Sequence, residues 1–329
     1  MSALTLRPSV EEVRAVVELA GLAPSLHNSQ PWHFTWDGEA LALREDASRA
    51  VPVLDGSGRE RLVSCGAALL QARLAFADLG WDARTTLLPD GDDGEVLALV
   101  RPTGRRLATG EEHALAAAAT RRCTDRDPYD DRPLAPFVLG ALRAAAEAEG
   151  AWLHVADTVE QRRAVAALVA RADAAQRSDP AYLAELAAWR REHEPTGVPA
   201  AALPTVPPGE RASRLPLRDF AADGPAPVPT AARPVEDPVV VVVGTAGDSR
   251  VDALVAGQAV GRVLLRATVA DVAAQPVTSV LEVPALREEL RATLALPGMP
   301  HMVLRLGYGT RGPVTRRLPV EAVLDVDTT

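Results

Sequence analysis

The chain has 329 residues, a formal net charge of −9, and 47% hydrophobic against 24% charged residues. This is the composition of a globular protein with one large domain or two ordinary ones, so a chain that is disordered throughout is excluded. The negative charge argues against nucleic acid or an anionic membrane as the main partner, because both attract a basic surface.

Further counts narrow the class of protein. The two cysteines, Cys65 and Cys123, are too few for a disulfide framework, and the six histidines are scattered, so we expect no metal site. The N-terminal residues carry no apolar run of the signal-peptide type, and no stretch of about 18 apolar residues occurs. We therefore expect a cytoplasmic protein with no membrane partner. The chain has no Lys, no Ile and a single Asn, Asn28, as a GC-rich coding sequence would give.

The first hundred residues predict a small set of elements in which one helix is unusual. Ser9 and Glu12 form a capping-box pattern at the start of the first helix. The expected elements are a helix at 10–20, a hairpin of strands at 32–36 and 40–44, a long helix at 59–79 and a strand at 96–101. The long helix is apolar on nearly every side, so it should be buried.

The remainder of the chain predicts a larger set of elements. Helices are expected at 110–120, 134–149, 159–175, 181–192, 251–272 and 285–294, and strands at 151–156, 239–243 and 302–306. Five consecutive valines indicate that strand 239–243 is fully buried. The two long apolar helices share a faint pattern around Gly66 and Gly257, which is consistent with a tandem duplication. The stretch 244–249 lacks a dinucleotide-binding pattern and is interpreted as a turn with a helix cap.

Residues 195–238 differ in kind from the rest, because they hold 11 of the 27 prolines and little periodicity. A segment of this length is either a functional lid or a surface linker. Leu215, Leu217 and Phe220 suggest that part of it packs against the protein.

A loop after the first helix concentrates polar groups between prolines. It consists of Pro24-Ser25-Leu26-His27-Asn28-Ser29-Gln30-Pro31-Trp32. Ser25, Asn28 and Gln30 could bind a polar, planar ligand, or the loop could be a connection whose side chains cap the neighbouring helix. A hydrolase built on Ser25 and His27 is disfavoured, because no Gly-x-Ser-x-Gly elbow is present.

Two later stretches carry arginines that could bind phosphate. Arg122, Thr124 and Arg126 alternate, so they point to one side of an extended chain and suit a phosphate or a polyol. The alternative is a solvated turn paired with the nearby aspartates. A glycine-rich loop at 307–309 is followed by Arg316 and Arg317, which could clamp a phosphate or be an ordinary surface pair.

Together these three stretches resemble the flavin-dependent nitroreductase family. That family has an Arg-x-Ser/Thr-x-Lys/Arg stretch, a Pro-Ser-x-x-Asn-x-Gln-Pro-Trp loop, and a C-terminal Leu-Gly-Tyr with basic residues after it. In that family the arginine stretch opens the chain and the loop follows it. Here the loop comes first, with no arginine stretch before it, and the Arg122 stretch comes about a hundred residues later, with no such loop after it. Each half of the chain therefore carries the motif that the other half lacks. This order is similar to the actinobacterial Acg branch, in which two family units are fused in one chain.

The resemblance implies an α+β, nitroreductase-like fold with FMN held between two tandem halves. The halves would be residues 1–108 and 109–329, with 195–238 as a Pro-rich lid, and the chain would be a monomeric pseudo-dimer. No side chain would act as a nucleophile. The cofactor-binding residues implied are Pro24, Ser25, Asn28, Gln30, Pro31, Trp32, Arg122, Thr124, Arg126, Arg316 and Arg317.

Two functions follow from the resemblance. The first is an oxidoreductase that uses NAD(P)H to reduce a nitroaromatic or quinone-like acceptor through the flavin. The second is a flavin-binding or sequestering protein with little turnover, because a lid covers the flavin. The sequence leaves both open.

Overall fold

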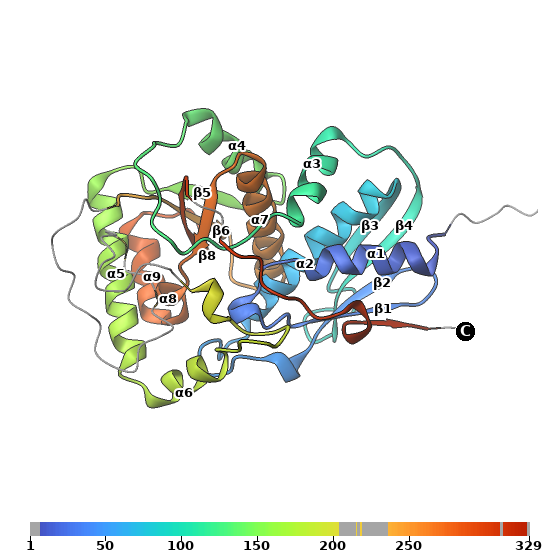
Figure 1. Ribbon diagram of the computed structural model, residues 1–329, viewed down its shortest axis with the longest axis horizontal. Helices are drawn as coiled ribbons and strands as arrows, with labels where there is room; N and C mark the ends of the chain where they lie inside the picture. The colour runs from blue at the N-terminus through green and yellow to red at the C-terminus, as the bar shows by residue number, and fades with distance from the viewer. Residues whose placement is uncertain (1–6, 204–214, 216–217, 219–235, 310–311, 328–329) are drawn as a thin grey trace, which may run out of the picture.

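The computed structural model describes residues 7–203, 215, 218, 236–309 and 312–327, and it contains two β-sheets (Figure 1). The first sheet has the order β3-β4-β2-β1-β9 and the second β5-β6-β8-β7. The first contains β1 (Trp32–Trp36), β2 (Leu41–Glu45), β3 (Trp81–Leu87), β4 (Val96–Arg105) and β9 (Leu324–Val326). The second contains β5 (Trp152–Val155), β6 (Val239–Thr245), β7 (Ala273–Pro276) and β8 (Met299–Gly307).

Helices lie between the sheets and over their faces. They are α1 (Val10–Gly21), α2 (Arg59–Asp78), α3 (Gly110–Ala119), α4 (Pro136–Glu147), α5 (Val159–Arg177), α6 (Pro180–Ala188), α7 (Arg250–Val269), α8 (Ser279–Glu282) and α9 (Pro284–Thr293). This mixed content agrees with the predicted α+β class. Within the described ranges, no helix is long and apolar enough to cross a membrane.

The helices α2 and α7 pack along each other in the middle of the molecule, with one sheet on either side (Figure 1). A Cβ atom built on Gly66 would lie 2.3 Å from the carbonyl oxygen of Leu254, and one on Gly257 would lie 2.1 Å from that of Val63. Only glycine permits so close an approach. The faint sequence pattern shared by the two helices therefore marks the point where they cross.

One hydrophobic core joins both sheets through these helices. It includes Phe34 and Leu43 from the first sheet and Val241 and Val243 from the second. The alternate residues Val240 and Val242 face a second cluster, formed with α5, α8 and α9. The second sheet is thus covered on both faces, which explains why the valine run of β6 shows no polar alternation.

The strand β9 joins the first sheet, although it follows the last strand of the second sheet in the chain. It lies parallel to β1, with Phe34 opposite Leu324, whereas the other described ladders are antiparallel. This pairing joins the C-terminal part of the described chain to a strand of its N-terminal part. The sequence did not predict β9, nor the strands β3 and β7.

The Pro-rich segment is described only in part. The structure covers 195–203, Leu215, Arg218 and 236–238 of it, and the remainder, with Leu217 and Phe220, lies outside the described residues. Leu215 is 2% exposed and packs in the cluster of α5, α8 and α9. The prediction that part of this segment packs is therefore confirmed at Leu215.

Candidate functional site

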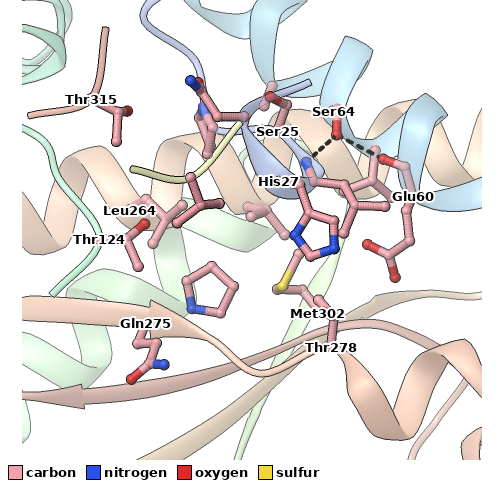
Figure 2. Close-up of a pocket in the computed structure, with 18 of the residues that line it drawn as sticks. Ser25, His27, Glu60, Ser64, Thr124, Leu264, Gln275, Thr278, Met302 and Thr315 are labelled. Carbon is pink, nitrogen blue, oxygen red and sulfur yellow. Dashed lines mark hydrogen bonds between the residues drawn. The ribbon is translucent and has the colours of Figure 1, made fainter. Parts of the chain in front are cut away.

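A pocket lies alongside the crossing of α2 and α7 (Figure 2). Its empty volume, counted with the space open to solvent, is about 1240 Å³. The walls come from the loop 24–28, α2, the stretch 122–126, α7, the stretch 275–279 with Met302, and the tail 313–317. Val198 and Arg218 of the Pro-rich segment also line it.

The loop between α1 and β1 has an unusual backbone. His27, Asn28 and Gln30 have φ angles of 48°, 56° and 53°, in the left-handed region that side chains other than Asn and Asp rarely adopt. Such strain persists only where neighbouring groups hold the chain, and it is common at binding sites. The single Asn of the sequence occupies one of these positions.

Gln30 holds this loop against two distant segments. Its side chain is buried; Nε2 donates to the carbonyl of Pro195 at 2.7 Å and Oε1 accepts from the backbone of Leu318 at 2.9 Å. Its backbone N–H donates to Ser25 Oγ at 3.0 Å. Gln30 therefore does not line the pocket, but it fixes the residues that do.

The remaining loop residues divide between the pocket and the core. Pro24, Ser25 and Asn28 line the pocket, as the sequence predicts. Pro31 and Trp32 do not, because they turn into the core, where Trp32 is fully buried. Asn28 Nδ2 donates to the carbonyls of Pro195 at 3.2 Å and Arg316 at 3.1 Å. Its Oδ1 is buried and has no partner among the described residues.

One end of the pocket is cationic. Arg122, Thr124 and Arg126 all line it, joined by Arg317 from the tail. Arg122 is only 7% exposed, and no ion pair joins it or Arg317 to a carboxylate in the described chain. Arg126 donates to the carbonyl of Ala202 at 2.8 Å. The alternative of a solvated charged turn is wrong for Arg122, which is buried.

Burial and mutual repulsion destabilise the charges at this end. The pKa of Arg122 is lowered by burial. The pKa of Arg317 falls to about 9, first through burial and then through the positive charge of Arg122. Buried like charges without counter-ions are costly unless an anion joins them. The arrangement is thus suited to a phosphate or another anionic group.

Arg316 points elsewhere. Its guanidinium donates to the carbonyl of His193 at 3.2 Å, and the side chain does not line the pocket. The adjacent Arg317 donates instead to the carbonyls of Leu22 and Ala23 at 3.3 and 3.4 Å, beneath the loop. Of the predicted arginine pair, only Arg317 reaches the pocket.

The opposite end of the pocket carries an acid that sequence reasoning missed. Figure 2 shows Glu60, His27, Met302 and Thr278 together, away from Thr124 and Thr315 at the other side. Glu60 begins the buried part of α2, and its backbone carbonyl accepts from Ser64 Oγ at 2.8 Å. Burial raises the pKa of Glu60 to about 7.

Other wall residues were not predicted, because they lie outside the motifs or, like Leu26, His27 and Cys123, at positions that the motifs leave unspecified. They are Leu26, His27, Val63, Ser64, Ala67, Cys123, Val198, Arg218, Val260, Leu264, Gln275, Pro276, Val277, Thr278, Ser279, Met302, Pro313 and Thr315. Val63, Ala67, Val260 and Leu264 add apolar surface to the wall. A planar ring with an anionic tail suits a pocket that combines apolar and cationic surfaces. The structure shows no cluster of metal-ligating side chains in its described part.

Comparison with known proteins gives relatives over nearly the whole chain. "Putative NAD(P)H nitroreductase Rv3131" of Mycobacterium tuberculosis is 35% identical over 306 residues, or 92% of this chain and 86% of the relative. "Putative NAD(P)H nitroreductase acg" of the same species is 31% identical over 327 residues, or 97% and 96%. No family model matches the chain. Among solved structures, an FMN-bound nitroreductase from Desulfitobacterium hafniense aligns with 63% of this chain and 94% of its own, at 14% identity and a TM-score of 0.38.

Proposed function

The chain belongs to the nitroreductase family that includes Acg, and from that membership we propose that it is an FMN-binding oxidoreductase. It would use NAD(P)H, which the names of its relatives specify, to reduce a nitroaromatic or quinone-like acceptor. One observation carries the proposal. The loop 24–28, the stretch 122–126 and the tail 313–317 are far apart in sequence, yet residues of all three line one pocket.

The residues present fit FMN. Arg122, Arg126 and Arg317 would hold the phosphate, which would relieve the buried charges of Arg122 and Arg317. Two buried oxygens, Asn28 Oδ1 and Gln275 Oε1, have no described partner and could accept from a flavin ring N–H. Each of these features supports the cofactor without using the geometry of another protein.

When bound, FMN would supply the transfer of hydride or single electrons. The protein supplies position and environment: the arginines hold the anionic tail, and the apolar side chains of α2 and α7 exclude water from the middle of the pocket. Gln30 keeps the strained loop in register with the tail through Leu318. The proposal requires no nucleophilic side chain.

We also propose that the halves 1–108 and 109–329 form an intramolecular pseudo-dimer that works as a cytoplasmic monomer. The pairing of Gly66 with Gly257 supports this, because each half contributes its long helix to one crossing. The addition of β9 to the first sheet supports it as well, since one half completes the sheet of the other.

The test is to measure which flavin the protein binds. The apoprotein should bind FMN with a saturable change in flavin fluorescence, and riboflavin, which lacks the phosphate, should bind much more weakly. Bound FMN should then be bleached by NAD(P)H without air and restored by a quinone. A protein that binds neither flavin would contradict the proposal.

A sequestering role is the second candidate, and the Pro-rich segment favours it. Pro195 accepts hydrogen bonds from Asn28 and Gln30, and Val198 and Arg218 line the pocket. If the segment narrows access, NADPH should reduce the bound flavin slowly while dithionite reduces it fast. Rapid mixing of both reductants with the native chain, and with a chain shortened within 204–214, separates the two functions. Fast reduction by NADPH that shortening leaves unchanged would favour the oxidoreductase.

A further inference from the structure

The acidic end of the pocket contains a carboxyl group that the cofactor does not need. The side chain of Glu60 is 3% exposed and lines the pocket on the side away from Thr124 and Thr315 (Figure 2). Its Oε1 lies 2.5 Å from Arg59 Nη2. Arg59 also donates to the carbonyls of His301 and Leu281, each at 3.2 Å, so the guanidinium is fixed by backbone groups as well.

Two more carboxylates lie near Glu60. Glu282 is buried, accepts from Gln176 Nε2 at 2.5 Å and pairs with Arg218. Asp55 accepts from the backbone N–H groups of Glu60 at 3.0 Å and Arg61 at 2.9 Å. Both negative charges act on Glu60 electrostatically.

The buried charges around Glu60 do not balance. Among the described residues, four carboxylates, those of Glu60, Glu282, Asp55 and Glu45, face three guanidinium groups, those of Arg59, Arg218 and Arg61, the last of which pairs with Glu45. Beyond Arg59, the pair Arg287–Asp248 is neutral as a unit, and burial keeps the pKa of His301 at about 4. An excess negative charge in a buried cluster favours the uptake of a proton.

The pKa directions identify the group that holds this proton. The pKa of Glu60 is raised to about 7: burial raises it most, Arg59 opposes this effect, and the negative charges of Glu282 and Asp55 support it. The pKa of the neighbouring His27 lies well below its usual range, through burial and the charges of Arg218 and Arg126. His27 is thus neutral near pH 7, and Glu60 is the acid at this end of the pocket.

We propose that Glu60 is the general acid that protonates the acceptor during its reduction in this pocket. The inference rests on the proposed function. A quinone needs two electrons and two protons to become a hydroquinone, and FMN, when bound and reduced, would supply both electrons and one proton as a hydride. The second proton leaves the Glu60 carboxyl as its O–H bond breaks and an O–H bond forms on the acceptor. Water then reprotonates the carboxylate.

The first test replaces Glu60 with the isosteric amide. Glu60→Gln should lower the rate of quinone reduction by bound, prereduced flavin by at least about a hundredfold, the usual contribution of a general acid. FMN affinity and the rate of flavin reduction by dithionite should stay within about twofold of wild type. Glu149→Gln is the matched control, because Glu149 is equally buried between Arg73 and Arg262 but lies outside the pocket wall. Quinone reduction by Glu60→Gln at the wild-type rate would overturn the proposal.

The pH profile gives a second and independent test. The rate of quinone reduction by the native protein should fall as pH rises through about 7, because the Glu60 carboxyl loses its proton. This falling part of the pH profile, its alkaline limb, should be absent from Glu60→Gln. Glu282→Gln removes a negative charge beside Glu60, so it should move the limb to lower pH by at least one unit. An unmoved limb in Glu282→Gln would contradict the assignment even if Glu60→Gln fails to fold.

Infrared titration of the protein without substrate supplies a readout apart from activity. A protonated carboxyl band should disappear with a midpoint near pH 7 in the native chain and be absent from Glu60→Gln. A band unaffected by the substitution would overturn the assignment. Flavin content measured on the same samples distinguishes the two failures: absent flavin refutes the proposed function and this inference with it, whereas normal flavin with unchanged quinone reduction refutes the role of Glu60 alone.

Discussion

At the scale of single residues, Arg122 and Arg316 have different surroundings, so their replacement by alanine should affect FMN binding differently. Arg122→Ala should weaken FMN binding about ten- to a hundredfold, because a charge-assisted hydrogen bond contributes about 1.5–3 kcal/mol. Arg316→Ala should change it less than about twofold, since Arg316 contacts His193 outside the pocket. Fluorescence titration of both apoproteins with FMN measures the difference.

Riboflavin is the control ligand for this pair. Its weaker binding should be nearly the same in both variants and the native chain, because it has no phosphate for Arg122 to hold. Equal loss of FMN affinity in the two variants would remove Arg122 from the phosphate site. Thermal unfolding of each apoprotein shows whether the fold remains intact.

Glu60 should also make stability depend on pH. The unfolded chain releases this proton near the ordinary pKa of 4.5, whereas the folded chain keeps it to about 7. Between these values the native state binds more protons, so the free energy of unfolding falls as pH rises. Below about pH 4.5 Glu60 is protonated in both the folded and the unfolded state, and its contribution to the free energy of unfolding is fully present.

Glu60→Gln lacks this titration. Its stability relative to the native chain should therefore increase by roughly 3 kcal/mol between pH 4.5 and pH 7, from about 1.4 kcal/mol per unit of pKa shift. Denaturant unfolding at both pH values gives this difference, and the effects of other groups cancel within the pair. A difference that is constant with pH would show that folding does not raise the pKa of Glu60.

The sequence predicted the cationic end of the site better than the acidic end, for a physical reason. Arg122, Thr124 and Arg126 alternate along an extended chain, so their common direction can be derived from local geometry. Glu60 stands between Arg59 and Arg61, a pattern that is ordinary for the exposed first turn of a helix. Asp55 and Glu282 make its surroundings acidic, and Glu282 lies more than two hundred residues later, so no local pattern reveals that contact.

At the scale of elements, the crossing of α2 and α7 tolerates no side chain at its centre. Gly66→Ala would place a Cβ against the backbone of Leu254, so the helices must separate, and we expect a loss of about 1–3 kcal/mol. Gly140→Ala is the control, because Gly140 lies within α4 with nothing near its added Cβ. That change should stabilise the protein by roughly 0.5–1 kcal/mol, since alanine favours helix.

Chemical denaturation of the two variants measures both effects. The same change of glycine to alanine should lower the free energy of unfolding at Gly66 and raise it at Gly140. A general effect of alanine on the unfolded state would act in the same direction at both positions, so it cannot explain this difference. If Gly66→Ala is as stable as the native chain, the contact between α2 and α7 is looser than the close approach described above.

Elements with a strong internal pattern were predicted, whereas three of the four edge strands of the two described sheets were not. The hairpin of β1 and β2 and the valine run of β6 carry their own signals, and the observed ends differ from the expected ones by a few residues. The missed strands β3, β7 and β9 are all at sheet edges. β7 contains Pro276, and β9 has three residues, so each depends on its partner strand and not on its own propensity.

At the scale of the whole molecule, the two sides of the helix crossing differ. Leu264 lies seven residues after Gly257 and lines the pocket, and the corresponding residue of α2, seven after Gly66, is Arg73. Likewise Ala67 of the pocket corresponds to Gln258. Arg73 binds Gln258 and Glu149, both at 2.6 Å, and Glu149 also binds Arg262 at 2.6 Å. If the two halves form the proposed pseudo-dimer, these ion pairs fill the place that a second, symmetry-related pocket would need.

We therefore expect one FMN per chain. Flavin released from the saturated protein and quantified against protein mass should give a ratio near one. A ratio near two FMN per chain would contradict two statements: that ion pairs fill the place of a second pocket, and that the two proposed halves together form one site. Native mass spectrometry of the holoprotein provides the same count together with the number of chains.

The pairing of β9 with β1 has a consequence for synthesis on the ribosome. Phe34 emerges early, but its partner Leu324 is 290 residues later in the chain. Until then the edge of β1 is open, and open edges favour pairing with other chains. The first sheet therefore stays incomplete during translation until almost the entire described chain, including β9, has been made. Translation speed and chaperone supply should accordingly affect the yield of folded protein more than the equilibrium stability of either half does.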